Sequence, residues 1–178
     1  MRVIAGQFRS RPLKSLPGLD TRPTPDRLRE TLFDVLAPRI QGAIFADLYA
    51  GTGAVGIEAL SRGAKKTIFV ESNRSAVRVI RENLKSLELR DCAEVRHRPA
   101  ISALPEIRAD IVFLDPPYRL EREYFSALEM LGQRGPGLEP GLVIAQHDAR
   151  LVLAESYTKL RRTRELKQGD NVLSFYEP

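Results

Sequence analysis

Apolar runs of strand length alternate with helix-patterned segments through the middle of the chain, and this alternation constrains the fold more than any other feature. The runs expected to be strands are residues 43–48, 67–71, 93–97, 109–115 and 141–147. Between them lie segments whose composition and apolar spacing indicate helices, residues 53–63, 72–87 and 120–135. Strands that alternate with helices form a mostly parallel sheet with helices on both faces. We therefore predict an α/β fold.

The amino-terminal residues predict two smaller elements. Residues 25–37 repeat apolar residues at helical spacing, with Thr24 as a candidate N-cap and Pro25 in the first helical position. Residues 1–19 contain short apolar stretches broken by glycine and proline, which indicates a short hairpin with basic side chains on its exposed face.

The end of the chain predicts a second hairpin. Residues 158–166 and 171–176 have the composition of strands, and Gly169-Asp170 between them is a turn signal. Such a hairpin would give the otherwise parallel sheet an antiparallel edge strand. A length of 178 residues fits one domain, or one domain with a small appendage.

The segment Gly51-Thr-Gly53-Ala-Val-Gly56 follows the first strand and matches the nucleotide-binding pattern G-x-G-x-x-G. Glu71 lies twenty residues after Gly51 at the tip of the next strand, where an acid can accept both ribose hydroxyls. The pattern by itself also fits a NAD site. Asp47, four residues before Gly51, favours another ligand, because its carboxylate would repel a pyrophosphate but suits the ammonium and sulfonium groups of S-adenosylmethionine. We therefore favour S-adenosylmethionine over NAD.

The segment IVFLDPPY, residues 111–118, joins an apolar strand to an acid, two prolines and an aromatic ring. The Asp115 carboxylate and the Pro116 carbonyl can accept hydrogen bonds from an exocyclic amino group, which favours a pyramidal nitrogen with a directed lone pair. Pro117 keeps this turn rigid, and Tyr118 offers a face on which an unstacked base can lie. These four residues predict methylation of a nucleobase amino group, and they leave the choice between guanine N2 and adenine N6 open.

Four motifs in order, VIAGQFRSRPL, TRPTPDRLRETLF, DLYAGTGAVGIEALSRGA and DPPY, make the chain resemble the bacterial RsmD-type 16S rRNA guanine-N2 methyltransferases. The resemblance implies a Rossmann-like, seven-stranded S-adenosylmethionine-dependent methyltransferase sheet with an antiparallel last strand. It divides the chain into a basic, RNA-contacting hairpin extension over residues 1–24 and a methyltransferase domain over residues 25–178. The implied substrate is one guanine of 16S rRNA, within a small ribosomal subunit or an assembly particle.

The resemblance also assigns roles to residues that match the family motifs. It implies a catalytic element and a set of cofactor-binding residues. The catalytic residues are Asp115, Pro116, Pro117 and Tyr118, and the cofactor-binding residues are Thr24, Asp47, Tyr49, Gly51, Gly53 and Glu71. Three segments depart from the family pattern, namely Arg98-Pro99 after the third strand, Gln146-His147 after the fifth, and Lys167-Gln168-Gly169 near the end. Pro99 replaces an acid that usually accepts from the adenine amino group.

The charge distribution favours a polyanionic partner. The formal net charge is +5, and residues 1–29 hold seven basic side chains against Asp20 and Asp26. A second basic cluster covers residues 159–167. Such a field suits RNA or DNA. The residues predicted to bind RNA are Arg2, Arg9, Arg11, Lys14 and Arg22.

Composition excludes several other classes. One cysteine and two histidines predict neither an intrachain disulfide nor a metal site. The start lacks the apolar region of a secretory signal, and no apolar run approaches the ~18 residues of a membrane span, so we expect a cytoplasmic monomer. Three alternatives stay open: an adenine-N6 methyltransferase on RNA or DNA, a NAD-dependent oxidoreductase, and a catalytically silent RNA-binding factor.

Overall fold

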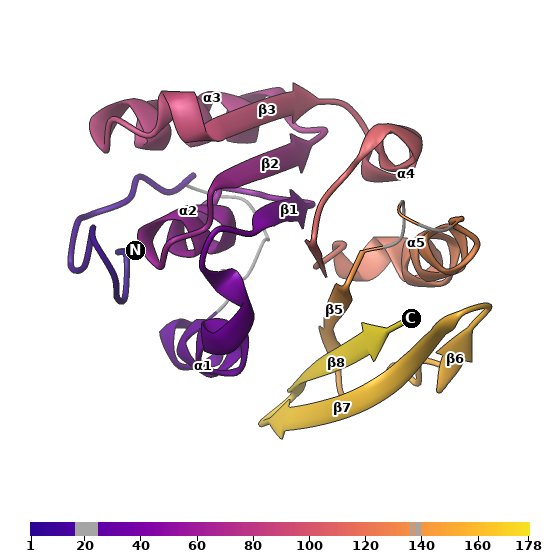
Figure 1. Ribbon diagram of the computed structural model, residues 1–178. Coiled ribbons are helices and arrows are strands. Elements are labelled where there is room, and N and C mark those ends of the chain that lie inside the picture. The colour runs from indigo at the N-terminus through magenta and orange to yellow at the C-terminus, as the bar shows by residue number, and fades with distance from the viewer. Residues whose placement is uncertain (17–24, 136, 138–139) are drawn as a thin grey trace.

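The computed structural model describes residues 1–16, 25–135, 137 and 140–178, and for Tyr118 the backbone alone. The described residues form one sheet of eight strands in the order β3-β2-β1-β4-β5-β8-β7-β6 (Figure 1). The strands are β1 Ile44–Leu48, β2 Lys66–Glu71, β3 Ala93–His97, β4 Ile111–Leu114, β5 Leu142–Asp148, β6 Ser156–Tyr157, β7 Leu160–Gln168 and β8 Asn171–Glu177. Strands β1 to β5 pair in parallel, whereas β8 pairs antiparallel with both β5 and β7.

Helices cover both faces of this sheet, as the alternation of elements predicts. The helices are α1 Asp26–Ile40, α2 Ala54–Ser61, α3 Arg74–Ser86, α4 Ala100–Ala103 and α5 Arg122–Gly132, with 3-10 turns η1 Arg90–Cys92, η2 Leu104–Glu106 and η3 Tyr118–Leu120. One apolar core lies under α1, α2 and α3 and contains Phe45, Phe69 and Phe113. The other lies under α4 and α5 and contains Ala46 and Leu48. Successive residues of β1 thus point into opposite cores, which is why every residue of this strand except Asp47 is apolar.

The predicted Rossmann-like α/β fold is confirmed, with differences at its edge. The sheet has eight strands among the described residues rather than seven, because the two residues of β6 pair with the start of β7. The predicted terminal hairpin forms around Gly169, which has a φ of 62°. Its antiparallel strand β8 lies inside the sheet, between β5 and β7, and the edge is β6.

Helix α1 begins and ends later than its pattern predicts. Pro25 occupies the N-cap position rather than the first helical position, and the helix runs to Ile40 instead of ending at residue 37. Pro38 lies in the last turn of α1, so only two helical residues follow the hydrogen bond that its missing N–H removes. The predicted cap, Thr24, lies outside the described residues.

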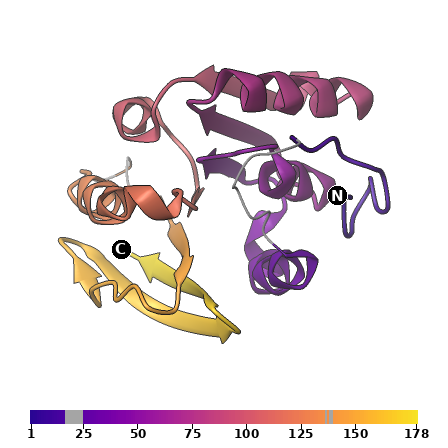
Figure 2. The ribbon, with the colours of Figure 1, turned by 180° about the vertical axis from the view of Figure 1, so that it is seen from behind.

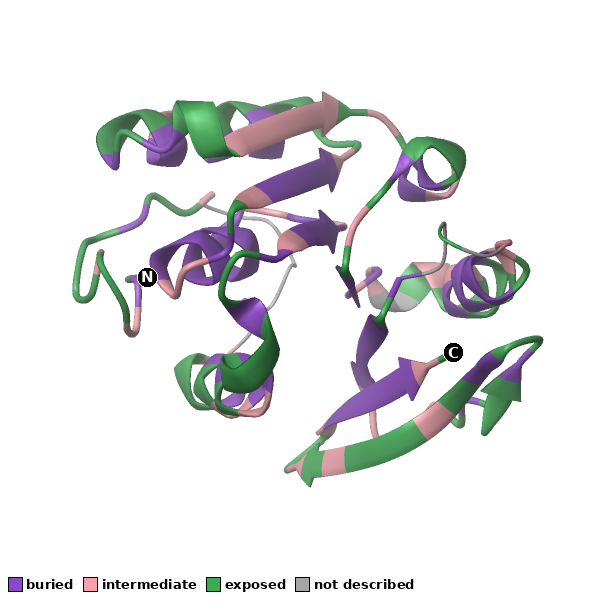
Figure 3. Cartoon of the chain, viewed as in Figure 1, coloured by how far each residue is buried: buried purple, intermediate pink, exposed green. Residues whose placement is uncertain are grey.

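Residues 1–16, here called the N-terminal arm, lie against α2 in both views of the molecule (Figures 1 and 2). The arm has the antiparallel bridge Arg2–Pro12 of the expected hairpin but no regular strands. The reason is that helix α2 supplies partners for several of its backbone groups. The buried Glu58 carboxylate accepts from the N–H groups of Ile4 and Ala5 at 2.8 and 3.0 Å. All residues of α2 are consequently buried (Figure 3).

The sheet order places the predicted motifs at one edge. The chain moves outward from β1 through β2 to β3 and then returns to β4, which pairs in parallel with β1 on its other side. Leu48 of β1 is in register with Val70 of β2 and with Leu114 of β4. Open α/β sheets bind ligands at such a switch point, outside the carboxyl ends of the strands.

Candidate functional site

The loop between β1 and α2 has an unusual backbone. Tyr49, Gly51 and Gly53 have φ angles of 67°, 56° and 81°, a left-handed conformation that non-glycine residues seldom adopt. Gly53 is the N-cap of α2. Gly56 has a different role, since a Cβ there would lie 2.3 Å from the Phe69 ring. The first two glycines therefore shape the loop, and the third lets α2 pack closely on β2.

Asp47 is buried in β1 and forms a hydrogen bond with the first turn of α2, directly after this loop. Its side chain is 2% exposed, and Oδ2 accepts from the Gly56 N–H at 2.8 Å. Burial raises the pKa of Asp47 to about 7, the Gly56 N–H lowers it, and the nearby carboxylates of Asp115 and Glu71 raise it further. Asp115 and Glu71 therefore lie close enough to Asp47 to raise its pKa at the switch point. The role predicted for Asp47 toward a sulfonium stays a prediction. The structure adds that Asp47 accepts a hydrogen bond from the first turn of α2, directly after the loop.

Glu71 ends β2 and organises the other side of the loop. Its Oε2 accepts from the Gly51 N–H at 2.8 Å, and its Oε1 accepts from the Asn73 N–H at 2.7 Å. The Asn73 side chain in turn caps α3 by accepting from the N–H groups of Ser75 and Ala76. Each carboxylate oxygen can accept more than one hydrogen bond, so Glu71 keeps acceptor capacity for a ligand hydroxyl.

Asp115 follows β4 directly, beside the end of β1. It is half-buried, and burial raises its pKa to about 7. Gln146 of β5 donates from Nε2 to Asp115 Oδ2 at 3.3 Å. Pro116 is buried and Pro117 half-buried, so the Asp-Pro-Pro step is part of the packed structure. Tyr118 begins the turn η3.

Three polar residues that sequence reasoning did not select also contact this site. Gln146 is 6% exposed, and its Oε1 is buried without a hydrogen-bond partner. Glu123 of α5 accepts from the Tyr49 hydroxyl, and burial together with this bond raises the pKa of Tyr49 above its ordinary value. The sequence did contain an indication for Gln146, because it is a polar residue near the carboxyl end of an apolar strand.

The third such residue, Asn83, links the glycine loop to the N-terminal arm. Its side chain is 1% exposed, and Nδ2 donates to the Thr52 and Lys14 carbonyls, both at 3.1 Å. Its Oδ1 accepts from the Lys14 N–H at 2.8 Å. An asparagine within the apolar face of the predicted helix was the sequence signal for this contact.

The described residues predicted to bind RNA are exposed on the arm. Arg2 Nε lies 3.7 Å from Asp26 Oδ2, and Lys14 Nζ forms an ion pair with Glu82 Oε2 at 3.0 Å. Arg9 and Arg11 are exposed. Arg22, like the predicted cofactor residue Thr24, lies outside the described residues.

The described residues offer neither a metal-binding cluster nor a membrane-spanning helix. They contain no group of three or more His, Cys, Asp or Glu side chains placed to hold a metal ion. None of their helices combines the length and the apolar character that crossing a bilayer requires.

Comparisons with known proteins match nearly the whole chain. The family model described as "Conserved hypothetical protein 95" matches residues 1–177. The Bacillus subtilis protein named "Putative rRNA methyltransferase YlbH" is 37% identical over 182 residues, 99% of this chain and 98% of that protein. The Haemophilus influenzae "Ribosomal RNA small subunit methyltransferase D" is 35% identical over 90% of this chain and 86% of its own length.

A solved structure shows the same fold. The structure titled "Putative methyltransferase yhhF from Escherichia coli" has a TM-score of 0.83 and is 32% identical in sequence. The match covers 99% of this chain and 97% of that one. The similarity therefore includes the N-terminal arm as well as the sheet.

Proposed function

Because the chain belongs to the conserved hypothetical protein 95 family, and relatives named ribosomal RNA small subunit methyltransferase D confirm the RsmD-type resemblance of its motifs, we propose that it methylates rRNA. The proposed reaction moves a methyl group from S-adenosylmethionine to the exocyclic N2 amino group of one guanine in 16S rRNA. The observation that carries this proposal is the position of Asp115-Pro116-Pro117 at the end of β4, directly beside the β1 glycine loop.

The residues around the loop fit the proposed cofactor. S-adenosylmethionine would supply an electrophilic methyl group, and its ammonium and sulfonium carry positive charge. Asp47, Glu71 and Asp115 surround the loop with carboxylates, which would attract such a ligand and repel the pyrophosphate of NAD. The open space around Gly51, where a Cβ would meet no atom within 4 Å, lets a ligand approach the backbone closely.

Asp115 and the Pro116 carbonyl are proposed to accept the two hydrogens of the target amino group. With both hydrogens held, the nitrogen lone pair can point at the methyl carbon, and orientation of this kind supplies much of the rate. A pKa of about 7 leaves the Asp115 carboxylate basic enough to take the proton that the nitrogen loses after methylation. Tyr118 is proposed to stack on the base.

We propose that residues 1–24 form the RNA-contacting extension and residues 25–178 the methyltransferase domain. Arg2, Arg9, Arg11 and Lys14 would contact phosphates, which position RNA without specifying its sequence. Arg22 would contribute to the same extension, and Thr24 to cofactor binding. The proposed partner is 16S rRNA on a small ribosomal subunit or assembly particle, and the protein would act there as a cytoplasmic monomer.

The test combines ligand binding with one substitution. Calorimetry should show S-adenosylmethionine binding and no NAD binding, and the opposite result would reject the methyltransferase proposal. Asp115→Ala should lower methyl transfer by a factor on the order of 10² or more while RNA affinity stays within about twofold. Unchanged methyl transfer would reject the catalytic role of Asp115, and no transfer by either protein would indicate an RNA-binding factor without activity.

A further inference from the structure

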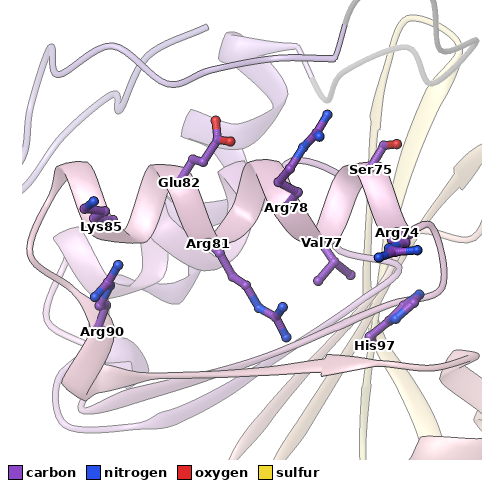
Figure 4. A pocket seen from close by; sticks show the side chains of 9 residues that line it. All are labelled: Arg74, Ser75, Val77, Arg78, Arg81, Glu82, Lys85, Arg90 and His97. Carbon is purple, nitrogen blue, oxygen red and sulfur yellow. The ribbon is translucent and has the colours of Figure 1, made fainter.

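A strongly basic groove lies along the outer side of α3. Its volume is about 520 Å³. Residues of α3, of η1 and of the end of β3 line it (Figure 4). Its lining is Arg74, Ser75, Val77, Arg78, Arg81, Glu82, Lys85, Arg90 and His97. Only Val77 among these is apolar, so the lining does not suit an apolar ligand or a hydrophobic peptide.

The basic residues of the groove follow the repeat of the helix. Arg74, Arg78, Arg81 and Lys85 are spaced by four, three and four residues, which places them on one side of α3. At a rise of 1.5 Å per residue, this stripe of cations is about 16 Å long. Arg90 adds a further cation beyond Lys85. In Figure 4, Arg81 extends toward β3, Arg74 lies beside His97 at one end, and Lys85 lies near Arg90 at the other.

The cations of the groove are not neutralised within the part of the chain that the structure describes. No carboxylate there forms an ion pair with Arg74, Arg78, Arg81, Lys85 or Arg90, whereas other surface cations such as Lys66 and Arg62 do have such partners. The groove contains one acid, Glu82, and this carboxylate is paired with Lys14 of the arm at 3.0 Å. The groove therefore presents an excess of positive charge to solvent.

The groove is also connected to both parts of the proposed site. Arg74 follows Asn73, whose N–H donates to Glu71, so one end of the groove lies at the carboxyl edge of the sheet. Lys14 joins α3 to the arm through its ion pair with Glu82 and through its backbone bonds to Asn83. The arm and the groove thus form one basic surface that borders the glycine loop.

We propose that this groove, the α3 groove, binds the phosphate backbone of the RNA substrate next to the target nucleotide; this inference rests on the proposed function. Cations at successive turns of a helix match a chain of phosphates better than they match one small anion. Arginine is suited to this role because its guanidinium donates to phosphate oxygens in a bidentate manner. Such contacts are independent of base identity, and they hold the RNA while the site selects the base.

The test compares two double charge reversals. Arg78→Glu with Arg81→Glu changes the groove, and Lys65→Glu with Arg108→Glu is the control, since Lys65 and Arg108 are exposed and lie outside the groove and the arm. The probe is an in vitro transcript of 16S rRNA, titrated at several salt concentrations. The groove variant should bind at least about tenfold more weakly at 0.1 M salt, and the slope of log affinity against log salt should become less steep by about 1.4.

One further variant and one further readout make the result decisive. Arg78→Lys with Arg81→Lys keeps both charges and should retain most of the affinity. Equal affinities and equal salt slopes for the groove and control variants would overturn the proposal. A loss of binding to small ribosomal subunits without a loss for the naked transcript would also overturn it, because the groove would then contact a ribosomal protein. If the unchanged protein transfers no methyl group, the proposed function fails, but the affinity comparison still decides the groove.

A crosslink provides a measurement that does not depend on charge reversal. Cys92 is exposed, and it lies two residues from Arg90 at one end of the groove. A photoactivatable group attached to Cys92 of the otherwise unchanged protein should crosslink to the 16S rRNA transcript. Excess unlabelled transcript should suppress the crosslink. A yield no higher than that from the same group on a Cys92→Ser, Lys65→Cys protein would contradict the proposal.

Discussion

At the scale of single residues, the site contains two acids, Asp47 and Asp115, whose burial makes them harder to ionise than ordinary carboxyl groups. Asp47 and Asp115 both have pKa values raised to about 7, chiefly by burial. They differ in their partners, since Asp47 accepts from a backbone N–H of α2 and Asp115 from the side chain of Gln146. Asp47 therefore stabilises the start of α2 and, with it, the loop. Asp115 is the acid that is proposed to gain a proton during the reaction.

The pH dependence of methyl transfer should report Asp115. Its carboxylate must be ionised to accept from the amino group, so kcat/KM should rise with pH through about 7 and fall below it. Asp115→Asn keeps a carbonyl oxygen as acceptor, so it should retain part of the activity but lose this pH dependence. A pH profile measured for both proteins checks this, and an unchanged inflection near pH 7 in the variant would assign it to another group, such as Asp47.

Gly56 tests the packing that supports the loop. Gly56→Ala would place a methyl group 2.3 Å from the Phe69 ring and 2.8 Å from Thr67 Cγ2, so α2 or β2 must shift. The free energy of unfolding should fall by about 1–3 kcal/mol. Urea denaturation measures it, with Gly135→Ala as the control, because a Cβ at Gly135 meets no atom within 4 Å. Equal stability of the two variants would show that helix and strand move apart at no cost.

At the scale of elements, periodicity predicted the parallel strands and the long helices, because strands such as β1 and β2 are buried on both faces and α3 is buried on one. It could not predict the structure of the N-terminal arm. The arm satisfies several of its backbone donors with Glu58 and Ser61, which lie more than fifty residues away in the sequence. A pattern of apolar residues carries no information about such partners.

Glu58 should be the main residue that fixes the arm. Its buried carboxylate accepts from two arm N–H groups and from Arg62 Nε at 2.9 Å. Glu58→Gln replaces one acceptor by an amide donor, so a buried N–H loses its partner at a cost of about 1–3 kcal/mol. Urea denaturation and limited proteolysis of the arm measure the effect. The exposed Glu30→Gln is the control, and if Glu58→Gln were as stable as this variant, the arm would not depend on Glu58.

At the scale of the whole molecule, the sequence indicated a basic protein with positive charge near its termini. It did not reveal the α3 groove, because acids such as Glu88, Asp91 and Glu94 are interspersed among the cations along the chain. Glu94 forms ion pairs with Lys66 and Arg96, so its negative charge does not offset the cations of the groove. More of the candidate site than of the charge surface could be predicted from the sequence, since Asp47, Glu71 and Asp115 each lie at the carboxyl end of an apolar strand pattern. The pairing of Gln146 with Asp115, and of Glu123 with Tyr49, could not be predicted before the strand and helix positions were known.

The arm should contribute to RNA binding independently of the groove. Arg9 and Arg11 are exposed, and no described residue forms an ion pair with either. Arg9→Glu with Arg11→Glu should weaken binding of the 16S rRNA transcript about tenfold or more and make its salt dependence less steep. Fluorescence anisotropy at several salt concentrations measures both, with Lys65→Glu, Arg108→Glu as the matched control. Unchanged binding would mean that these side chains are only solvated.

The identity of the methylated atom tests the central claim most directly. Small ribosomal subunits from cells that lack this protein are incubated with the purified protein and S-adenosylmethionine carrying an isotopically labelled methyl group. The rRNA is then digested to nucleosides and analysed by mass spectrometry. We predict labelled N2-methylguanosine at one position of 16S rRNA, absent with Asp115→Ala. Labelled N6-methyladenosine, or no labelled nucleoside at all, would contradict the proposed function.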